Sequence, residues 1–188
     1  MPFWRTNLLQ KFLMKKIIAF AGSSSKNSIN KQLVTYMTSL FKESESEVLD
    51  LNDYEMPIYS ADRELESGVP KLAIDFFQKL GSADLILISL AEHNGAYSAA
   101  FKNIFDWTSR HNNKLFQQKL VLLMATSPGP RGGLGVLEMA KDRFPRHDAN
   151  VVATFSLPSF RDNFDPAIGI TNEALKIEMQ SFVKAIVF

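Results

Sequence analysis

Short, uninterrupted runs of apolar residues alternate along this chain with longer segments in which apolar residues recur every three or four positions. The apolar runs are typical of buried strands and lie at residues 17–21, 84–90, 119–125 and 150–155, with a briefer strand predicted at 47–51. The segments with helical spacing lie at residues 28–42, 69–80, 99–109, 134–144 and 171–187. Because the central strands are apolar throughout, both faces of their sheet must be covered, which favours a parallel sheet between two layers of helices.

The connections between these elements carry their own signals. Ser28 and Thr171 are the predicted N-caps of the first and last helices. The polar stretch 59–66 and the stretch after residue 155, rich in Pro, Asp and Phe, are predicted to be irregular. Right-handed crossovers leave two common strand orders, and both place ligands beyond the carboxyl ends of the strands. The loops after the strands are therefore where a functional site is expected.

Composition narrows the function classes. The chain has 188 residues, enough for one domain, and 46% of them are hydrophobic. A net charge of +1 gives no field for binding nucleic acid, and no run of about 18 apolar residues is present to span a membrane. The absence of cysteine excludes disulfides and thiolate chemistry and fits a cytoplasmic protein. The histidines are not at metal-ligand spacing, so no metal site is expected; they are His93, His111 and His147.

Residues 1–14 form an N-terminal extension ahead of a domain predicted to span residues 15–188. Polar residues interrupt its apolar stretch, so no signal peptide is expected. Its apolar residues at helical spacing would suit docking on a partner or a membrane surface, and they are Trp4, Leu8 and Phe12. The alternative, which we favour, is an upstream start codon with the natural chain beginning at Met14.

Serines crowd the loop after the first predicted strand, which reads Gly22-Ser23-Ser24-Ser25-Lys26-Asn27-Ser28 and leads into a helix through Ile29 and Asn30. Hydroxyl donors and the positive end of a helix favour an anion there, and a phosphomonoester fits. A serine-rich capping turn is the structural alternative. The loop lacks the Gly-Lys-Ser/Thr of a P-loop and the three glycines of the dinucleotide fingerprint.

Flat rings and an amide follow the third predicted strand, in the loop Ala91-Glu92-His93-Asn94-Gly95-Ala96-Tyr97. Asn94-Gly95 is a turn signal. Asn94 offers a donor and an acceptor, and His93 and Tyr97 offer faces to a ring system. We expect Glu92 to anchor the turn rather than to react. For His93 the alternative is an exposed loop histidine without a ligand.

Glycines dominate the loop after the fourth predicted strand, with Ser127 followed by four glycines in seven positions at Gly129, Gly132, Gly133 and Gly135. Such a loop lets main-chain amides approach a ligand closely, and a flexible loop is the alternative. The three loops are expected at one edge of the sheet. The first would offer a phosphate site, the second the faces of aromatic rings, and the third free main-chain amides. That combination suits a mononucleotide, but the residues alone do not distinguish FMN from another phosphorylated aromatic ligand.

Taken in order, the three loops resemble motifs of the NADPH-dependent FMN reductase family, over about residues 15–155. The family's Gly-Ser-x-Arg-x-x-Ser-x-Asn is matched at Gly22, Ser23, Ser28 and Asn30, with Ser25 in place of the arginine. Its Pro-Glu-Tyr-Asn-Gly is matched at Glu92, Asn94 and Gly95, with Ala91 and His93 replacing the other two residues. Its Ser-x-Gly stretch with paired glycines is matched at Ser127, Gly129, Gly132 and Gly133.

The resemblance implies a flavodoxin-like three-layer α/β sandwich with a five-stranded parallel sheet in the order 2-1-3-4-5. It implies bound FMN, with NADPH or NADH as co-substrate. The phosphate would be held by side chains and amides between residues 23 and 30, namely Ser23, Ser25, Ser28, Ile29 and Asn30, with Lys26 standing in for the missing arginine. The isoalloxazine would lie against residues 91–97, with its pyrimidine edge on amides of residues 127–133.

By the same resemblance, the chain would pass a hydride from the nicotinamide through flavin N5 to a quinone, an azo dye or another small acceptor in a ping-pong reaction. The flavin does the chemistry, so no catalytic side chain is required. Family members are often homodimers or homotetramers. Two rival functions remain. A flavodoxin-type single-electron carrier is disfavoured by the near-neutral charge, and a flavin-less binding or regulatory relative is suggested by Ser25 and His93.

Overall fold

A five-stranded parallel sheet forms the centre of the computed structural model, which describes residues 14–186. Its strands are β1 (Lys15–Gly22), β2 (Ser44–Leu49), β3 (Leu85–Leu90), β6 (Leu120–Thr126) and β7 (Asn150–Leu157). They lie in the order β2-β1-β3-β6-β7. Counted over the sheet strands alone, this is the predicted order 2-1-3-4-5, so the expected flavodoxin-like sandwich is confirmed.

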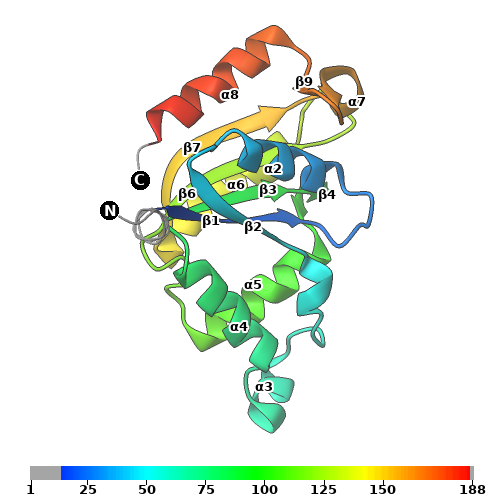
Figure 1. Cartoon of the computed structure of the whole chain (residues 1–188). Coiled ribbons are helices and arrows are strands. Elements are labelled where there is room, and N and C mark those ends of the chain that lie inside the picture. The colour runs from blue at the N-terminus through cyan, green and yellow to red at the C-terminus, as the bar shows by residue number, and fades with distance from the viewer. Residues whose placement is uncertain (1–13, 187–188) are drawn as a thin grey trace, which may run out of the picture.

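Helices cover both faces of the sheet (Figure 1). One layer contains α2 (Ile29–Ser39) and α8 (Glu173–Ala185), and the other contains α4 (Lys71–Gly81), α5 (Ala99–His111) and α6 (Leu134–Arg143). Each layer encloses its own apolar core, because successive strand side chains point to opposite faces. Phe20 of β1 packs in the core under α5, whereas Ala19 packs in the core under α2.

Burial explains why these segments form these elements. All six residues of β3 are buried, as their unbroken apolar sequence predicts for a strand covered on both faces. The edge strand β2 instead carries exposed polar residues at Glu45 and Ser46. In α2 the buried apolar side chains recur at helical spacing, at Leu33, Val34 and Met37.

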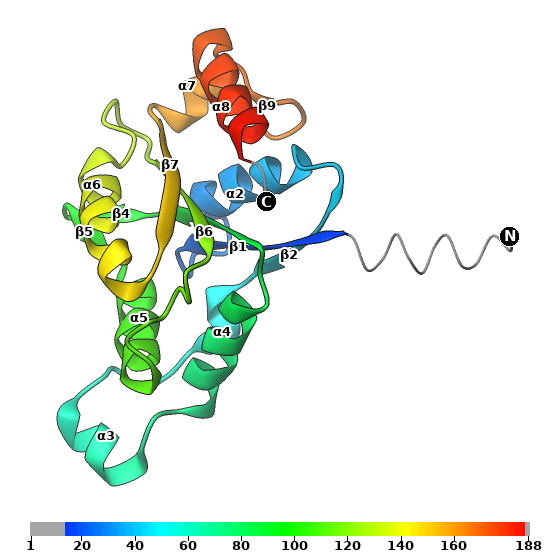
Figure 2. The same cartoon turned by 90° about the vertical axis from the view of Figure 1, so that its left-hand side faces the viewer.

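The stretch predicted to be an irregular loop at 59–66 contains a short helix, α3 (Ala61–Ser67), preceded by the 3₁₀ turn η1 (Leu51–Tyr54). Ser60 caps α3 by accepting a hydrogen bond from the main-chain N–H of Arg63, at 3.2 Å. The helix stands beyond α4 and α5, away from the sheet (Figure 1 and Figure 2). Since none of its residues is buried, it has no apolar periodicity from which the sequence could have predicted it.

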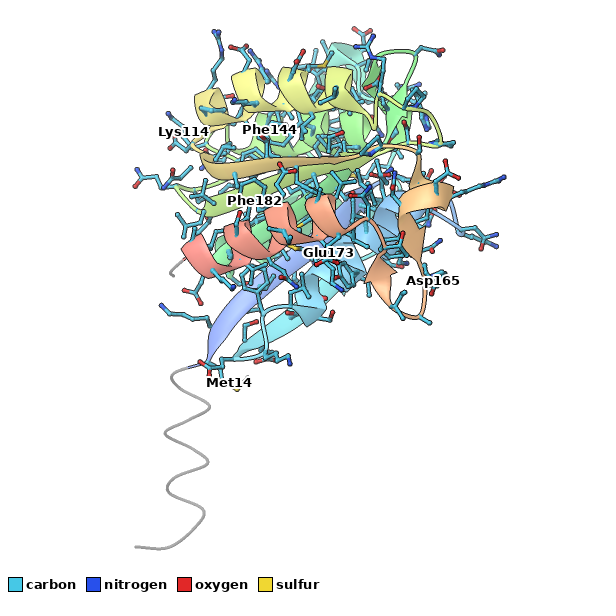
Figure 3. All side chains as sticks on the ribbon, turned by 90° about the horizontal axis from the view of Figure 1, so that it is seen from above. Met14, Lys114, Phe144, Asp165, Glu173 and Phe182 are labelled. Atoms are coloured by element: carbon cyan, nitrogen blue, oxygen red, sulfur yellow. The ribbon has the colours of Figure 1, made fainter. Side chains whose placement is uncertain are left out.

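The region after β7 is also more ordered than predicted. It holds α7 (Phe160–Asn163) and a hairpin of β8 (Phe164–Asp165) and β9 (Gly169–Ile170). Seen from above, Asp165 in this hairpin lies at the end of the molecule away from Met14 (Figure 3). The cap of α8 is Asn172 rather than the predicted Thr171, because the Asn172 side chain accepts the hydrogen bond from Leu175 N at 3.2 Å.

The N-terminal extension lies almost wholly outside the described residues, and so do its predicted docking positions Trp4, Leu8 and Phe12. Met14 directly precedes β1. Within residues 14–186, no helix is both long enough and apolar enough to cross a membrane.

Candidate functional site

The carboxyl ends of the central strands lie side by side, as predicted. Gly22 at the end of β1 is opposite Leu90 of β3, and Leu90 is opposite Ala125 of β6. Ser98, the N-cap of α5, donates a hydrogen bond from its hydroxyl to the Gly22 carbonyl at 2.8 Å. The three loops singled out in the sequence therefore leave the sheet from one edge.

The serine loop between β1 and α2 is ordered by its own hydrogen bonds. The Ser23 hydroxyl accepts from Ser25 N at 3.2 Å, and the Ser25 carbonyl accepts from Ser28 N at 3.2 Å. Ser28 is the predicted N-cap of α2, and its hydroxyl accepts from Lys31 N at 3.2 Å. The Ser28 hydroxyl hydrogen can still be donated to a ligand.

Main-chain donors at this loop have no acceptor within the described part of the chain. They are the N–H groups of Lys26, Asn27, Ile29 and Asn30. The first N–H groups of a helix lack intrahelical partners and carry the positive end of its dipole. The loop and the start of α2 thus hold free donors of the kind that a phosphate group would need, and the phosphate site stays a prediction.

Two lysines flank this region, but only one has a carboxylate partner. Lys31 pairs with Asp50 at 2.5 Å, and the hydrogen bond from Lys31 holds the pKa of Asp50 below its ordinary value. Lys26 is exposed and forms no ion pair with any described residue. The uncompensated charge beside the free amides is therefore that of Lys26, the residue expected to replace the family's arginine.

The Asn30 side chain has its hydrogen-bond partners within the protein. Its side chain is buried and bonds to the protein itself: Nδ2 donates to the Thr126 carbonyl at 3.2 Å, and Oδ1 accepts from Thr126 N at 3.1 Å and from Ser89 Oγ at 2.7 Å. The side chain is therefore engaged inside the protein, and what Asn30 offers a ligand is its main-chain N–H.

The second loop forms a tight hairpin that the sequence indicated only as a turn. Strands β4 (Glu92–His93) and β5 (Ala96–Tyr97) pair antiparallel, and Asn94 and Gly95 join them with φ values of 53° and 77°. Two successive residues with positive φ are typical of a two-residue Asn-Gly hairpin turn. His93, Asn94 and Gly95 are exposed at its tip, whereas Ala91 is buried at its base.

Glu92 anchors this hairpin to the next layer. Its carboxylate accepts a hydrogen bond from Val136 N, in the first turn of α6, at 3.0 Å. A carboxylate at a helix N-terminus is favourable because of the helix dipole. Glu92 is thus engaged in a structural contact, consistent with its expected anchoring role.

Tyr97, predicted to offer a ring face, is half-buried and packs against the aromatic core. Its ring stacks on Phe144 with centroids 6.1 Å apart and meets Phe101 edge-on at 5.4 Å. Its hydroxyl is buried without a hydrogen-bond partner among the described residues, and burial raises the pKa of Tyr97 to about 12. Tyr97 therefore belongs mainly to the core under α5 and α6, which leaves His93 as the exposed ring of this loop.

The glycine loop has two kinds of glycine. Gly132 and Gly133 have φ values of 56° and 77°, and a Cβ on Gly132 would lie 2.4 Å from Ser156 Oγ and 2.8 Å from Pro158 N. These two positions exclude any larger residue. At Gly129 the nearest heavy atom to a Cβ would be Ser127 Oγ, at 4.0 Å, so this position has open space in front of it.

The glycine loop is also fixed to α7. Ser159 N donates to the Gly129 carbonyl at 2.9 Å, and Phe160 N donates to the Ser127 carbonyl at 3.0 Å. The Ser127 hydroxyl donates to the Gly129 carbonyl at 3.2 Å. The loop is therefore held in one conformation, which argues against the alternative of a flexible connection.

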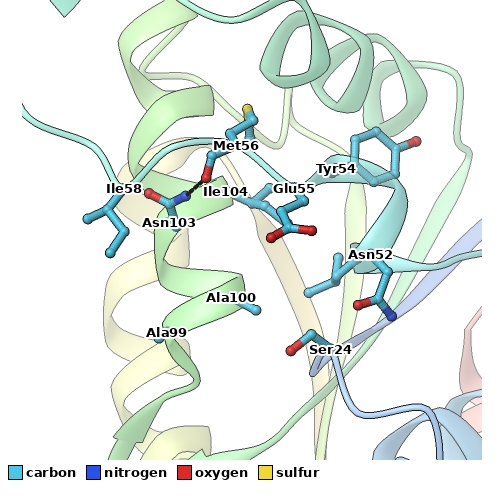
Figure 4. A pocket seen from close by; sticks show the side chains of 11 residues that line it. Ser24, Asn52, Tyr54, Glu55, Met56, Ile58, Ala99, Ala100, Asn103 and Ile104 are labelled. Carbon is cyan, nitrogen blue, oxygen red and sulfur yellow. Dashed lines mark hydrogen bonds between the residues drawn. The ribbon is translucent and has the colours of Figure 1, made fainter. Parts of the chain in front are cut away.

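A cavity of about 270 Å³ lies beside the serine loop, and the sequence had not indicated it (Figure 4). Ser24, Asn52 and the first turn of α5 border it. Met56 and Ile58 also line it, and the segment that carries them is fixed to α5: Asn103 Nδ2 donates to the Met56 carbonyl at 3.0 Å, and Tyr59 N donates to Asn103 Oδ1 at 2.9 Å. These contacts join residues more than forty positions apart, beyond the reach of a local sequence pattern.

Comparison with known proteins identifies the family whose motifs the three loops resemble. A sequence model of the NADPH-dependent FMN reductase family matches residues 15–162. An uncharacterised protein of Mycoplasma pneumoniae is 28% identical over 148 residues, covering 76% of this chain and 87% of that protein. The 2-hydroxy-1,4-benzoquinone reductase of a Burkholderia species is 35% identical over 96 residues, half of each chain. The quinone reductase of Escherichia coli K12 is 29% identical over 119 residues, 63% of each chain.

Solved structures share the fold. The flavoenzyme FerB of Paracoccus denitrificans superposes with a TM-score of 0.72 and 22% identity, covering 92% of this chain and 94% of that chain. An azoreductase of Bacillus anthracis superposes with a TM-score of 0.66 and 14% identity, covering 92% of this chain and 98% of that chain. The fold, the loops and the matched residues lead to one conclusion: this chain belongs to the NADPH-dependent FMN reductase family, a family of flavin oxidoreductases.

Proposed function

We propose that this chain binds FMN across the carboxyl edge of its sheet and reduces a small quinone-type acceptor at the expense of NADPH or NADH. The observation that carries the proposal is the pairing of two donor sets at that edge. Unpartnered amides and Lys26 lie in the serine loop and at the start of α2, and in the loop after β6 the N–H groups of Gly129 and Gly133 have no acceptor among the described residues. The first set suits a phosphomonoester, and the second suits the edge of a flat ring.

In this arrangement each loop has a distinct task. The hydroxyls of Ser23, Ser25 and Ser28 and the amides of Ile29 and Asn30 hold the phosphate. The hairpin tip at His93, Asn94 and Gly95 borders the isoalloxazine, and Glu92 fixes that hairpin against α6. The amides of Ser127, Gly129 and Gly133 would face the pyrimidine edge, where main-chain donors stabilise negative charge. The N–H of Gly132, also expected there, is instead donated to the Gly129 carbonyl at 3.2 Å.

When bound, FMN supplies the two-electron chemistry, accepting a hydride at N5 from the nicotinamide and passing reducing equivalents to the acceptor. The protein supplies binding, orientation and charge. A quinone-type acceptor is supported by two relatives that are themselves named quinone reductases, although the chain matches only 50% and 63% of their lengths.

The test is spectroscopic. Purified protein mixed with FMN and freed of excess should retain the flavin absorbance near its visible maximum. Anaerobic NADPH or NADH should bleach that absorbance, and a benzoquinone should restore it. Protein that stays colourless after FMN treatment would contradict the proposal and favour the flavin-less relative. Retained flavin that neither nucleotide bleaches would favour the single-electron carrier.

We also propose that the chain works as a homo-oligomer. Ile58, which lines the cavity at Ser24, is 77% exposed, and Leu65 in α3 is 90% exposed. Large apolar side chains exposed on a protruding segment favour a protein contact. Light scattering on the eluted protein should give a mass of two or four chains, and a mass of one chain would refute this.

A further inference from the structure

A buried hydrogen-bond junction lies directly beneath the proposed phosphate site. It consists of Asn30 in the first turn of α2, Ser89 in β3 and Thr126 at the end of β6. Both Asn30 and Ser89 are almost completely buried, and all three bonds are 3.2 Å or shorter. A single amide side chain thus joins a helix to two neighbouring strands.

The junction connects the two donor sets that the proposed function pairs. The main-chain N–H of Asn30 is one of the unpartnered amides of α2, so a shift of its side chain moves a phosphate donor. Thr126 is followed directly by Ser127, the first residue of the glycine loop. The distance between the phosphate donors and the glycine-loop donors is therefore fixed through the Asn30 side chain.

The hydroxyl of Ser89 fixes the position of the Asn30 side chain. The Asn30 carbonyl oxygen accepts from both Ser89 Oγ and Thr126 N, and the bond from Ser89 is the shorter, at 2.7 Å against 3.1 Å. Without the Ser89 hydroxyl, Asn30 would be held by Thr126 alone. Ser89 is also a polar residue within a strand that is otherwise apolar, where a hydroxyl needs a partner to offset the cost of its burial.

From this geometry we infer that Ser89 and Asn30 are positioning residues for the phosphate of FMN. They do not touch the ligand with their side chains. They hold the first-turn amides of α2 at the correct distance from the glycine loop. The inference rests on the proposed function, and it adds a residue, Ser89, that lies outside all three loops.

The experiment compares FMN with riboflavin, which carries the same ring without the phosphate. Dissociation constants for both are measured by flavin fluorescence for the wild type and for Ser89→Ala. Because Ser89→Ala should misplace the phosphate donors, it should raise the Kd for FMN about fivefold to tenfold, the loss expected from one buried hydrogen bond. The Kd for riboflavin should stay within about twofold of the wild-type value. Asn30→Ala should collapse the preference for FMN further.

Asp84→Ala is the matched control. Asp84 accepts a hydrogen bond from Lys16 N at 2.8 Å, joining the start of β1 to the residue before β3 at the opposite edge of the sheet. The Asp84→Ala substitution should lower the melting temperature without changing the ratio of the Kd for FMN to the Kd for riboflavin. If Ser89→Ala changes both constants equally, or neither, the inference is overturned, even where Asn30→Ala does not fold. If the wild type binds neither flavin, the proposed function fails as well.

Discussion

At the scale of single residues, Lys26 would supply, in the proposed phosphate site, the charge that the family's arginine otherwise provides. Lysine binds phosphate as a point charge rather than through a fixed pair of donors. Replacing it with alanine should therefore raise the Kd for FMN about threefold to tenfold at low salt, and less at high salt because an exposed charge is screened. Fluorescence titrations at two salt concentrations measure this.

Lys15→Ala provides the control for that variant. It removes the same charge from an exposed lysine at the start of β1, at the opposite edge of the sheet. Equal losses of FMN affinity in both variants would assign the effect to net charge rather than to the serine loop.

His147 links stability to pH. It is buried in the 3₁₀ turn η2 (Phe144–His147), and burial lowers its pKa below the ordinary value of 6.5. Nδ1 lies 2.8 Å from the Asn113 carbonyl, and Nε2 is buried with no partner among the described residues. Protonation would place an unpaired N–H on a buried ring, so the folded protein favours the neutral form.

The sign of the pH effect follows from this pKa. Between the lowered folded pKa and the unfolded value, the unfolded chain binds more protons, so acidification below about pH 6.5 lowers the free energy of unfolding. Urea unfolding at pH 7.5 and pH 5.5 should show a smaller difference in His147→Gln than in the wild type. The exposed His111→Gln should keep the wild-type difference. An unchanged difference in His147→Gln would rule out His147 as the source.

At the scale of elements, alanine should cost very different amounts of stability at two positions of the glycine loop. Gly132→Ala would bring a Cβ within 2.8 Å of the Pro158 main chain at a φ of 56°, and should cost at least about 2 kcal/mol of folding free energy. Gly129→Ala meets no atom closer than 4.0 Å and should change the stability of the ligand-free protein by less than about 0.5 kcal/mol. Equal costs in urea unfolding would refute this description of the loop.

At the scale of the whole molecule, the proposed cofactor would contact loops from β1, β3 and β6, strands that also join the two helical layers. Such a ligand binds the folded state alone. FMN at a hundred times its Kd should therefore stabilise the protein by about 2.7 kcal/mol and raise its melting temperature by roughly 5–10 °C. Differential scanning fluorimetry measures the shift. Riboflavin at the same concentration should give a smaller shift in melting temperature. If FMN gives no shift, the result counts against FMN binding.

The sequence by itself determined the sheet, its flanking helices and the edge where the loops meet. Those features follow from signals that are local in the chain: unbroken apolar runs, helical periodicity, and glycine or serine at strand ends. It did not predict α3, because that helix buries no residue and so has no apolar face.

Only the tertiary structure decided which motif residues are exposed and which contact other parts of the protein. Asn30 bonds to Thr126, 96 positions away, and Glu92 bonds to Val136, 44 positions away. Tyr97 joins a core built with Phe144. A motif records that such a side chain is present, but its partner is chosen by packing between distant segments, because each buried polar group must find a hydrogen bond wherever the fold places one.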